Sequence, residues 1–252
     1  ATERILFESY IVKGDDMGQR FKAALIAAAE RGVAVYVIYD GFANIVVKRS
    51  FFKFPEPIRV LRFPVFPRTF AIFSPRAWGR DHRKILVVDD RIGFVGGYNV
   101  GSLYANQWRD THVCVFGSAV WDLENAFIDF WNGVCPDEQL RPLSAATWDP
   151  HVRAHRNVPR QLIYPIRGMY LEAIDRATST IEITQAYFIP DRNILDALVE
   201  ASRRGVRVRI LIPKVSNHVV ADFVARSYFG RLLDAGVEIL RYSDHMVHAK
   251  TM

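Results

Sequence analysis

A histidine and a lysine stand two residues apart at the start of an apolar segment, in the stretch DHRKILVVDDRIGFVGGYN from Asp81 to Asn99. The apolar run that follows them predicts a β-strand. Because a strand directs residues i and i+2 to the same face, His82 and Lys84 are expected to project side by side. An imidazole can act as a nucleophile or carry a proton, and an ammonium can bind a phosphate oxygen. The pair therefore predicts a site for an anionic phosphate ester.

The glycine-rich end of the same stretch extends this site. If residues 90 and 91 form a two-residue hairpin loop, Asn99 lies opposite His82 and Gly97 lies opposite Lys84. Asn99 would then offer an amide donor, and Gly97 would leave room beside the lysine. Each residue has a simpler explanation, because single histidines in strands are often structural, single lysines face solvent and Gly-Gly often marks a bulge.

A second His-x-Lys pair, His248 and Lys250, closes a second copy of the same sequence unit. Residues 4–40 and 180–213 both read as strand, helix and strand, with Tyr187 at the position of Tyr10 and Asp191 as a helix cap. A third strand follows in each copy, at 58–63 and 237–242, before the His-x-Lys pair. Any α/β protein shows βαβ units, but four matched elements in one order favour a duplication.

Composition restricts the class of protein and of partner. The 252 residues are 50% apolar and 24% charged, which predicts a folded chain, and the net charge of +6 favours anionic partners such as phosphate esters, nucleic acid or acidic lipid surfaces. No apolar run reaches the roughly 18 residues that span a bilayer. The two cysteines form no disulfide framework. The chain begins and ends within expected structure, so we expect a fragment of a longer protein.

The motif HRKILVVD, followed by GGYN, resembles the HxKxxxxD motif of the phospholipase D superfamily, with His82, Lys84 and Asp89 at the motif positions. The stretches SLYANQWRDTHV and AYFIPD are most similar to bacterial cardiolipin synthase-type members, and the resemblance spans nearly the whole chain. In the second copy His248 and Lys250 match, while the expected aspartate lies beyond Met252. The resemblance implies five catalytic-motif residues: His82, Lys84, Asp89, His248 and Lys250. Among them, Asp89 is expected to anchor the strand end rather than to carry a proton.

The resemblance implies an α/β fold of two tandem phospholipase D-like halves, each a mixed sheet flanked by helices and related to the other by pseudo-twofold symmetry. We expect the first half at residues 1–134, a polar linker at 135–161 and an incomplete second half at 162–252. Residues 64–80 are an insertion rich in proline, aromatic residues and arginine. This insertion is either a surface connection or a rim beside the first motif.

The implied chemistry is a two-step phosphodiester exchange. His82 would attack phosphorus and form a phosphohistidine, while His248 would protonate the leaving alcohol and then deprotonate the acceptor; the two histidines could also exchange roles. Lys84, Lys250 and Asn99 would bind the non-bridging oxygens. No cofactor is expected, because the lysines provide the positive charge that a metal ion supplies elsewhere.

Three further polar residues are expected to support this site. Asp110 is predicted to hold the His82 ring. The alternative is that Asp110 is a turn residue whose carboxylate pairs with Arg109. Glu8 and Gln185 stand at matched ends of first strands, where α/β proteins collect ligands, and are predicted to line the cleft.

The sequence thus favours a phospholipid phosphatidyltransferase of cardiolipin synthase type. The alternatives are a phosphodiester hydrolase of the same superfamily, either a phospholipase D or a nuclease, and a non-catalytic anion-binding fragment. The expected partners are an anionic phospholipid substrate and a membrane surface, with nucleic acid as the weaker alternative. We expect the protein at the cell membrane, peripheral or anchored by another segment, with the cytoplasm as the alternative. Because both motifs lie in one chain, an oligomer is not required for the site.

Overall fold

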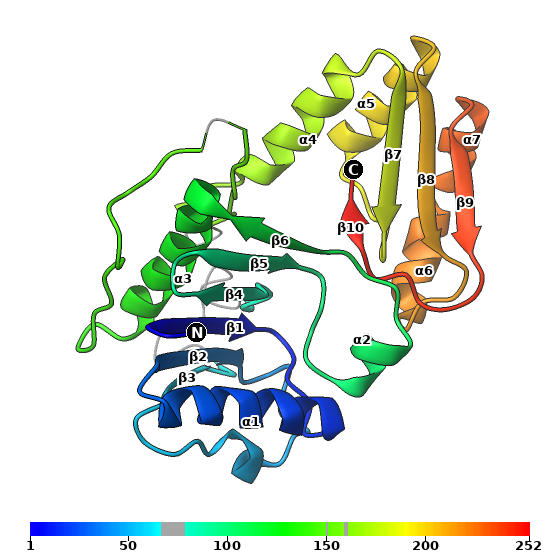
Figure 1. Cartoon of the computed structure of the whole chain (residues 1–252). Coiled ribbons are helices and arrows are strands. Elements are labelled where there is room, and N and C mark those ends of the chain that lie inside the picture. Colours follow the sequence, from blue (N-terminus) through cyan, green and yellow to red (C-terminus); the bar gives the residue numbers. More distant parts are fainter. Residues whose placement is uncertain (67–78, 150, 159–160) are drawn as a thin grey trace. The chain divides into compact units, whose positions relative to one another are not determined.

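The computed structural model describes residues 1–66, 79–149, 151–158 and 161–252 (Figure 1). The chain forms two compact units. The first unit comprises Ala1–Asn106 and His112–Ile163, and the second comprises Gln107–Thr111 and Tyr164–Met252. The short segment Gln107–Thr111 therefore belongs to the second unit, although the chain on both sides of it belongs to the first. Most of the predicted insertion, residues 67–78, lies outside the described residues.

The first unit contains a six-stranded mixed sheet in the order β3-β2-β1-β4-β5-β6. Strands β1, β2 and β3 are parallel, and β4, β5 and β6 continue the sheet with antiparallel pairing. The strands are β1 (Arg4–Ser9), β2 (Ala34–Asp40), β3 (Arg59–Phe63), β4 (Ile85–Val88), β5 (Ile92–Gly96) and β6 (His112–Phe116). Strand β1 ends at Ser9, and Val12 beyond it forms an isolated bridge with Val100.

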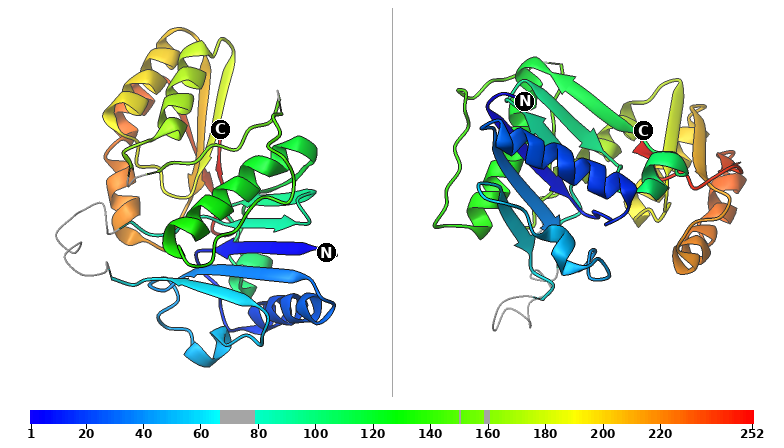
Figure 2. Two further views of the ribbon diagram at one scale, coloured as in Figure 1. Left: turned by 90° about the vertical axis from the view of Figure 1, so that its left-hand side faces the viewer. Right: turned by 60° about the horizontal axis from the view of Figure 1, so that its bottom comes forward.

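Helices cover both faces of this sheet, as Figure 2 shows for α1 and α3. Alternation along β1 sends Ile5 and Phe7 to the α1 face and Leu6 to the α3 face, so each face has its own buried cluster. The helical elements of the unit are α1 (Asp16–Glu30), η1 (Arg49–Phe52), α2 (Ser102–Asn106), η4 (Gly117–Ala119) and α3 (Val120–Val134). Asp15 caps α1 by accepting from the Gly18 N–H, and Gly32 ends the turn with φ of +89°.

The hairpin of the first motif differs from its predicted register by one residue. Val88 pairs with Ile92, so the loop has three residues, 89 to 91, and Asn99 is not a strand partner of His82. The Asp89 carboxylate is the physical reason. It accepts hydrogen bonds from the backbone N–H groups of Thr2, Glu3 and Arg4, at 2.8, 2.8 and 2.9 Å, and this holds Asp89 outside the ladder with φ of +52°.

The second unit repeats part of this sheet. Its order is β10-β7-β8-β9, in which β7, β8 and β9 are parallel and β10 is antiparallel to β7. This is the order β4-β1-β2-β3 of the first unit, and the topology therefore supports the duplication. The strands are β7 (Thr180–Gln185), β8 (Arg207–Pro213), β9 (Glu238–Tyr242) and β10 (Lys250–Thr251), and the helices are α4 (Pro165–Arg176), α5 (Arg192–Arg203), α6 (Val219–Arg226) and α7 (Phe229–Asp234).

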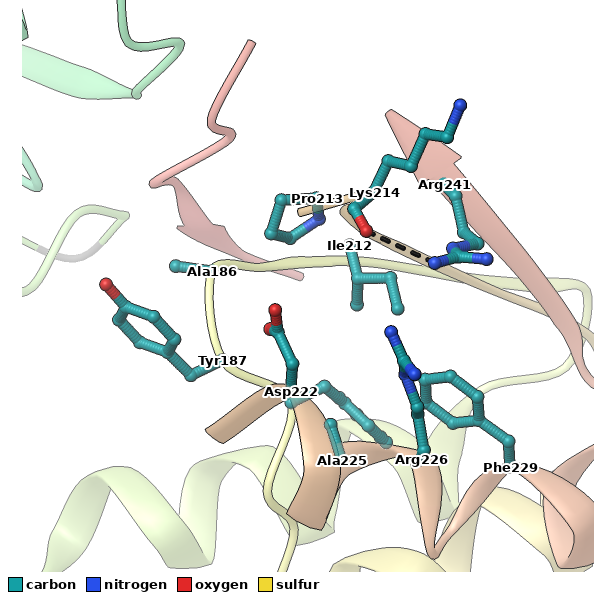
Figure 3. A pocket seen from close by; sticks show the side chains of 11 residues that line it. Ala186, Tyr187, Ile212, Pro213, Lys214, Asp222, Ala225, Arg226, Phe229 and Arg241 are labelled. Atoms are coloured by element: carbon teal, nitrogen blue, oxygen red, sulfur yellow. Dashed lines mark hydrogen bonds between the residues drawn. The ribbon is translucent and has the colours of Figure 1, made fainter. Parts of the chain in front are cut away.

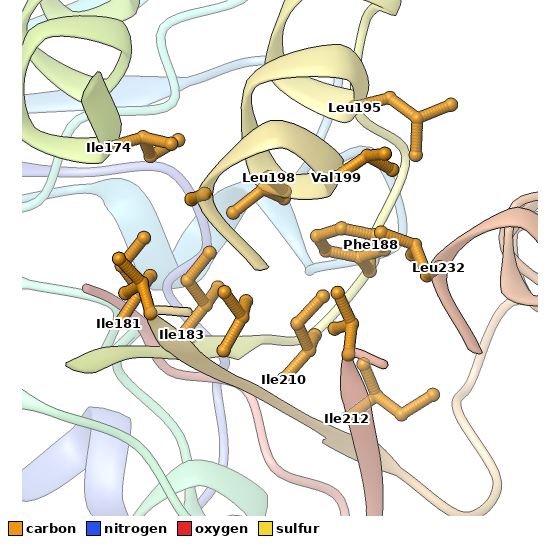
Figure 4. Packing of buried hydrophobic residues seen from close by; sticks show 14 residues of the cluster. Ile174, Ile181, Ile183, Phe188, Leu195, Leu198, Val199, Ile210, Ile212 and Leu232 are labelled. Carbon is orange, nitrogen blue, oxygen red and sulfur yellow. The ribbon is translucent and has the colours of Figure 1, made fainter. Parts of the chain in front are cut away.

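The core of the second unit lies between this sheet and α5 (Figure 4). Ile183 from β7 and Ile210 from β8 pack there against Leu198 of α5, which is fully buried. As the sequence predicts, Asp191 caps α5, by accepting from the N–H groups of Asn193 and Ile194. None of the helices in the described part of the chain has the length and apolarity needed to cross a membrane.

The segment predicted as a linker, residues 135–161, lies within the first unit. Leu140 is buried against α3, and the Asn132 side chain exchanges two hydrogen bonds with the Leu140 backbone. The Trp131 indole N–H donates to the Glu138 carbonyl at 2.9 Å. These contacts attach the start of the segment to the α3 face of the sheet, which composition alone does not indicate.

The three backbone hydrogen bonds to Asp89 generate a stability prediction. Partial burial raises the pKa of Asp89, but the bonds from Arg4, Glu3 and Thr2 outweigh this and lower the pKa to about 2. Asp89→Asn should therefore lower the free energy of unfolding of the first unit by about 2 kcal/mol at neutral pH. A lowered pKa stabilises the fold above the unfolded-state value of about 3.9, and this contribution disappears as pH falls through about 2.

Denaturant unfolding of wild type and Asp89→Asn at several pH values checks this prediction. The difference between the two should be largest near neutrality and should shrink in acid. Glu3→Gln is the matched control, because the Glu3 side chain is exposed in the same segment. A constant difference from neutral pH to pH 2 would show that the Asp89 charge does not stabilise the fold.

Candidate active site

The first His-x-Lys pair lies just before β4, at the end of the sheet where β1 and β2 finish. The Lys84 ammonium donates to the His82 carbonyl oxygen at 2.8 Å and lies 3.3 Å from His82 Nδ1, so the two side chains project together as the sequence predicts. Lys84 is buried, whereas His82 is exposed. The Tyr10 ring lies 4.5 Å from the His82 ring and 5.2 Å from the Lys84 ammonium. An exposed imidazole beside a buried cation is suited to an anionic substrate.

Arg83, between the two motif residues, points to the opposite side and anchors the motif backbone. Its guanidinium lies 2.5 Å from a Glu8 carboxylate oxygen, donates to the Ala126 carbonyl at 3.0 Å and stacks 4.2 Å from the Phe130 ring centre. Burial raises the pKa of Glu8 well above its usual value, and the charge of Arg83 opposes that shift. Because Glu8 is fully buried, the prediction that it lines an open cleft is wrong. Glu8 instead holds Arg83.

Asn99 lies past the end of β5 and is buried. Its side-chain oxygen accepts from the Ile11 N–H at 3.1 Å. This bond fixes the carboxamide next to Tyr10, the neighbour of Ile11, and turns the donor end of Asn99 away from Ile11. The carboxamide is therefore held at the motif end of the unit without strand pairing to His82. Gly97 lies in the bend between β5 and Asn99.

The second motif contains a buried histidine and carboxylate pair. His248 Nδ1 donates to an Asp110 carboxylate oxygen at 2.7 Å, and the side chains are 7% and 1% exposed. Asp110 reaches this position because Arg109 and Val247 form a parallel bridge, with the His248 N–H donating to the Arg109 carbonyl at 2.6 Å. The prediction that Asp110 holds His82 is therefore wrong, because the bridge commits Asp110 to His248.

Lys250 repeats the geometry of Lys84, because its ammonium donates to the His248 carbonyl oxygen. It faces Gln185 across the β10–β7 pair, so Gln185 stands beside the second motif. Partial burial of the ammonium lowers the pKa of Lys250 to about 8, and the Asp110 carboxylate opposes this shift by raising the pKa. The Lys250 charge is thus sensitive to pH close to neutrality.

Each unit therefore has a histidine, a lysine and a tyrosine at the same strand end, and the second unit adds the Asp110 carboxylate. A tyrosine accompanies each motif histidine, since the Tyr187 ring lies 6.3 Å from the His248 ring as Tyr10 lies near His82. A carboxylate that binds Nδ1 fixes the tautomer and leaves Nε2 of His248 to exchange a proton with a substrate, and it stabilises the imidazolium that forms. Together these groups support acid–base and nucleophilic chemistry on an anionic ester.

Two contributors to the site were not predicted as such from the sequence. Arg83 is the middle residue of a charged His-Arg-Lys run. The one sequence signal for its anchoring role was Glu8, an acidic residue within the apolar first strand that could pair with it. Trp108, whose ring lies 5.2 Å from His248, precedes Asp110 by two residues. The contact between Trp108 and His248 could not be inferred from the sequence, because Asp110 was expected to bind His82.

Asp89 does not take part in this group of side chains. It lies at the other end of β4, where it binds the N-terminal backbone. The expectation that Asp89 anchors the strand end agrees with this placement.

Comparison with known proteins gives one family and a consistent set of relatives. The family model described as cardiolipin synthase, PLD-like domain, matches residues 1–131 and 170–252. A cardiolipin synthase of Geobacillus sp. (strain WCH70) is 35% identical over 264 residues, which cover 100% of this chain and 53% of that protein. A cardiolipin synthase of Listeria innocua is 31% identical and is covered to 55%. The chain thus spans about half the length of the curated relatives that it matches.

Solved structures share the fold at low identity. A phosphatidylserine synthase from Haemophilus influenzae Rd KW20 matches with a TM-score of 0.62 and 15% identity, over 99% of this chain and 70% of that one. A polyphosphate kinase from Porphyromonas gingivalis matches with a TM-score of 0.54 and 15% identity, over 98% and 38%. These matches concern the α/β architecture.

The influence of the Asp110 charge on Lys250 generates a titration prediction. Because the Asp110 carboxylate raises the pKa of Lys250, Asp110→Asn should lower that pKa below about 8, and less of the ammonium should be charged at pH 7.5. An NMR titration of the Lys250 side chain measures this directly. Asp244→Asn is the matched control, since Asp244 is an exposed aspartate in the same unit. An unchanged or higher Lys250 pKa in Asp110→Asn contradicts the assignment.

Proposed function

The chain belongs to the cardiolipin synthase family of phospholipase D-like domains, and we propose that it is the catalytic part of a phospholipid phosphatidyltransferase. The observation that carries this proposal is the buried His248–Asp110 pair, which supplies an acid–base imidazole with a fixed tautomer. The substrate is an anionic phospholipid, and the acceptor is the hydroxyl of a glycerol-bearing lipid. The names of the relatives support this choice of substrate.

The proposed reaction has two displacements at phosphorus. In the first, Nε2 of His82 attacks phosphorus while Nδ1 of the same ring keeps its proton, and His248 Nε2 gives its proton to the leaving alcohol. The phosphorus–oxygen bond breaks as the phosphorus–nitrogen bond forms. In the second, His248 takes the proton of the acceptor hydroxyl, whose oxygen attacks phosphorus and releases His82. The two lysines stabilise the negative charge of each five-coordinate transition state.

The roles of the remaining polar groups follow from their contacts. Asn99, fixed by Ile11, offers its amide N–H to a non-bridging oxygen. Arg83 and Glu8 position the first motif without touching substrate. Both motifs are present in one chain, so the proposal requires no second copy. A phospholipid substrate places the protein at a membrane surface.

A substrate with an activated leaving group separates the roles of the two histidines. A phosphatidyl ester of p-nitrophenol needs no general acid for its first displacement. His248→Ala in the full protein should therefore release about one equivalent of p-nitrophenol in a burst and accumulate a covalent adduct at His82. His82→Ala should give no burst and should lose turnover by about 10⁴-fold or more.

His245→Ala is the matched control, because His245 is an exposed histidine three positions from His248. It should retain turnover and show no adduct. An adduct mapped to His248, or a burst in His82→Ala, would exchange the two roles. Wild-type protein that releases no p-nitrophenol at all would leave an anion-binding function.

The products made from phosphatidylglycerol distinguish transfer from hydrolysis. A transferase should form cardiolipin and free glycerol, whereas a hydrolase should form phosphatidic acid. Cleavage of a labelled oligonucleotide with a steep salt dependence would instead indicate a nuclease. Lipid chromatography of the full protein with labelled phosphatidylglycerol checks this prediction.

A further inference from the structure

Helix α6 of the second unit presents its apolar side chains outward. Val219, Val220 and Phe223 are 81%, 77% and 76% exposed, and Val215 just before the helix is 73% exposed. Among the residues of α6 only Ala225 is buried. A helix on a globular protein normally buries its apolar face. A contiguous exposed patch of this kind marks a contact surface.

Hydrogen bonds fix this outward orientation. The Asp222 carboxylate accepts from the Ser216 N–H at 3.1 Å, and the buried Ser216 hydroxyl exchanges hydrogen bonds with the His218 backbone. Asp222 is thereby turned toward the residues before the helix, so the side of α6 that carries Val219, Val220 and Phe223 remains outside. The exposure is built into the local structure.

Cationic side chains surround the apolar patch. Lys214, Arg226 and Arg241 line a small pocket beside α6 with Asp222 as the acidic member (Figure 3). Arg241 donates to the Lys214 carbonyl oxygen at 3.1 Å, so its guanidinium is held at the end of β9. The pocket itself, about 20 Å³, has room for water and not for a lipid headgroup. The charges therefore serve the surface around the helix.

The first unit has an exposed apolar segment at the corresponding place. It follows β2, as the α6 segment follows β8, and its Phe42, Ile45 and Val46 are 52%, 65% and 79% exposed. This segment is also held in place. The Asp40 carboxylate accepts from two backbone N–H groups at its start, and the buried Asn44 side chain accepts from the Val12 N–H.

Lysines accompany this segment as well. A cavity of about 650 Å³ in the first unit is lined by Val46 together with Lys13, Lys22 and Lys48. The Arg80 guanidinium lies 5.1 Å from the Phe42 ring centre. An apolar tip bordered by cations therefore occurs in both units, at the same position of the repeated fold.

An asparagine joins each segment to the tyrosine of its motif. In the first unit the Asn44 amide donates to the Tyr10 carbonyl at 2.8 Å, and the Tyr10 ring contacts His82. In the second unit the Tyr187 hydroxyl donates to the Asn217 side-chain oxygen at 2.5 Å, and Tyr187 lies near His248. In each unit the exposed segment and the motif thus lie at the same end of the sheet.

We propose that residues 41–47 and 214–226 are the membrane-contact segments of this protein, which insert apolar side chains into the surface of an anionic bilayer. This inference rests on the proposed function, since a substrate that resides in a bilayer must reach the motif end of each sheet. Apolar side chains bordered by lysine and arginine match the chemistry of an anionic lipid interface, where cations meet the headgroups.

An environment-sensitive fluorophore at single cysteines tests the proposal. Cys114 and Cys135 are first replaced by serine, together with any cysteine elsewhere in the full protein, and labels are placed at Val46→Cys or Val220→Cys. The matched control is Leu233→Cys. Leu233 is 55% exposed on α7, the helix that leads into β9, and it lies outside residues 214–226. Vesicles of phosphatidylcholine with phosphatidylglycerol should shift the emission of the first two labels to the blue and leave the third unchanged.

Three results would overturn the proposal. The Val46 and Val220 labels could remain unshifted, the Leu233 label could shift equally, or the labels could already be blue-shifted without vesicles, which would show that protein covers the segments. Vesicles of phosphatidylcholine alone should give a smaller shift. Lys214→Gln should weaken binding to anionic vesicles roughly fivefold and reduce its salt dependence.

Activity measurements keep this proposal distinct from the catalytic one. Val220→Ser combined with Phe223→Ser should weaken turnover of vesicle substrate at least roughly tenfold, while turnover of a short-chain monomeric phospholipid should be unchanged. Equal loss on both substrates would contradict a role in membrane contact. If the wild-type protein transfers no phosphatidyl group, the label shifts still decide whether these segments contact lipid, because they require no turnover.

Discussion

Antiparallel pairing of the motif strand with the first strand determines where the reactive groups lie in each unit. The parallel strands β1 and β2 end at one edge of the sheet, and β4 must begin at that same edge because it runs in the opposite direction. Residues just before β4 therefore meet the residues just after β1. The same pairing of β10 with β7 places Lys250 opposite Gln185. The positions of both lysines, both histidines and both tyrosines follow from this one constraint.

The sequence predicts much of this arrangement because the relevant signals are local. Helical periodicity, the Asp191 cap and the repeated order of strands identify the duplicated α/β unit. The spacing of His82 and Lys84 predicts their shared face. The bond from each lysine to the carbonyl of its own histidine is equally local, as it spans two residues.

The features that the sequence does not predict depend on contacts between distant segments. The hairpin register is set by Asp89, which binds the backbone of residues 2 to 4 and so cannot be assigned from the loop alone. The partner of Asp110 depends on the bridge between Arg109 and Val247, residues far apart in the chain. Glu8 stands at a strand end like a ligand residue, but the guanidinium of Arg83 draws its carboxylate into the interior. Ala249, buried at the position of Arg83 in the second motif, has no charge to place, so the two copies support their motifs by different means.

The path of the chain around Gln107–Thr111 has a consequence for dividing this protein. The backbone passes from one unit to the other after Asn106, returns after Thr111 and passes again after Ile163. A second half expressed from Tyr164 onward would contain His248 and lack the carboxylate that holds it. The two copies, although similar in topology, are thus no longer separable modules, because five residues of sequence adjoining one motif complete the other.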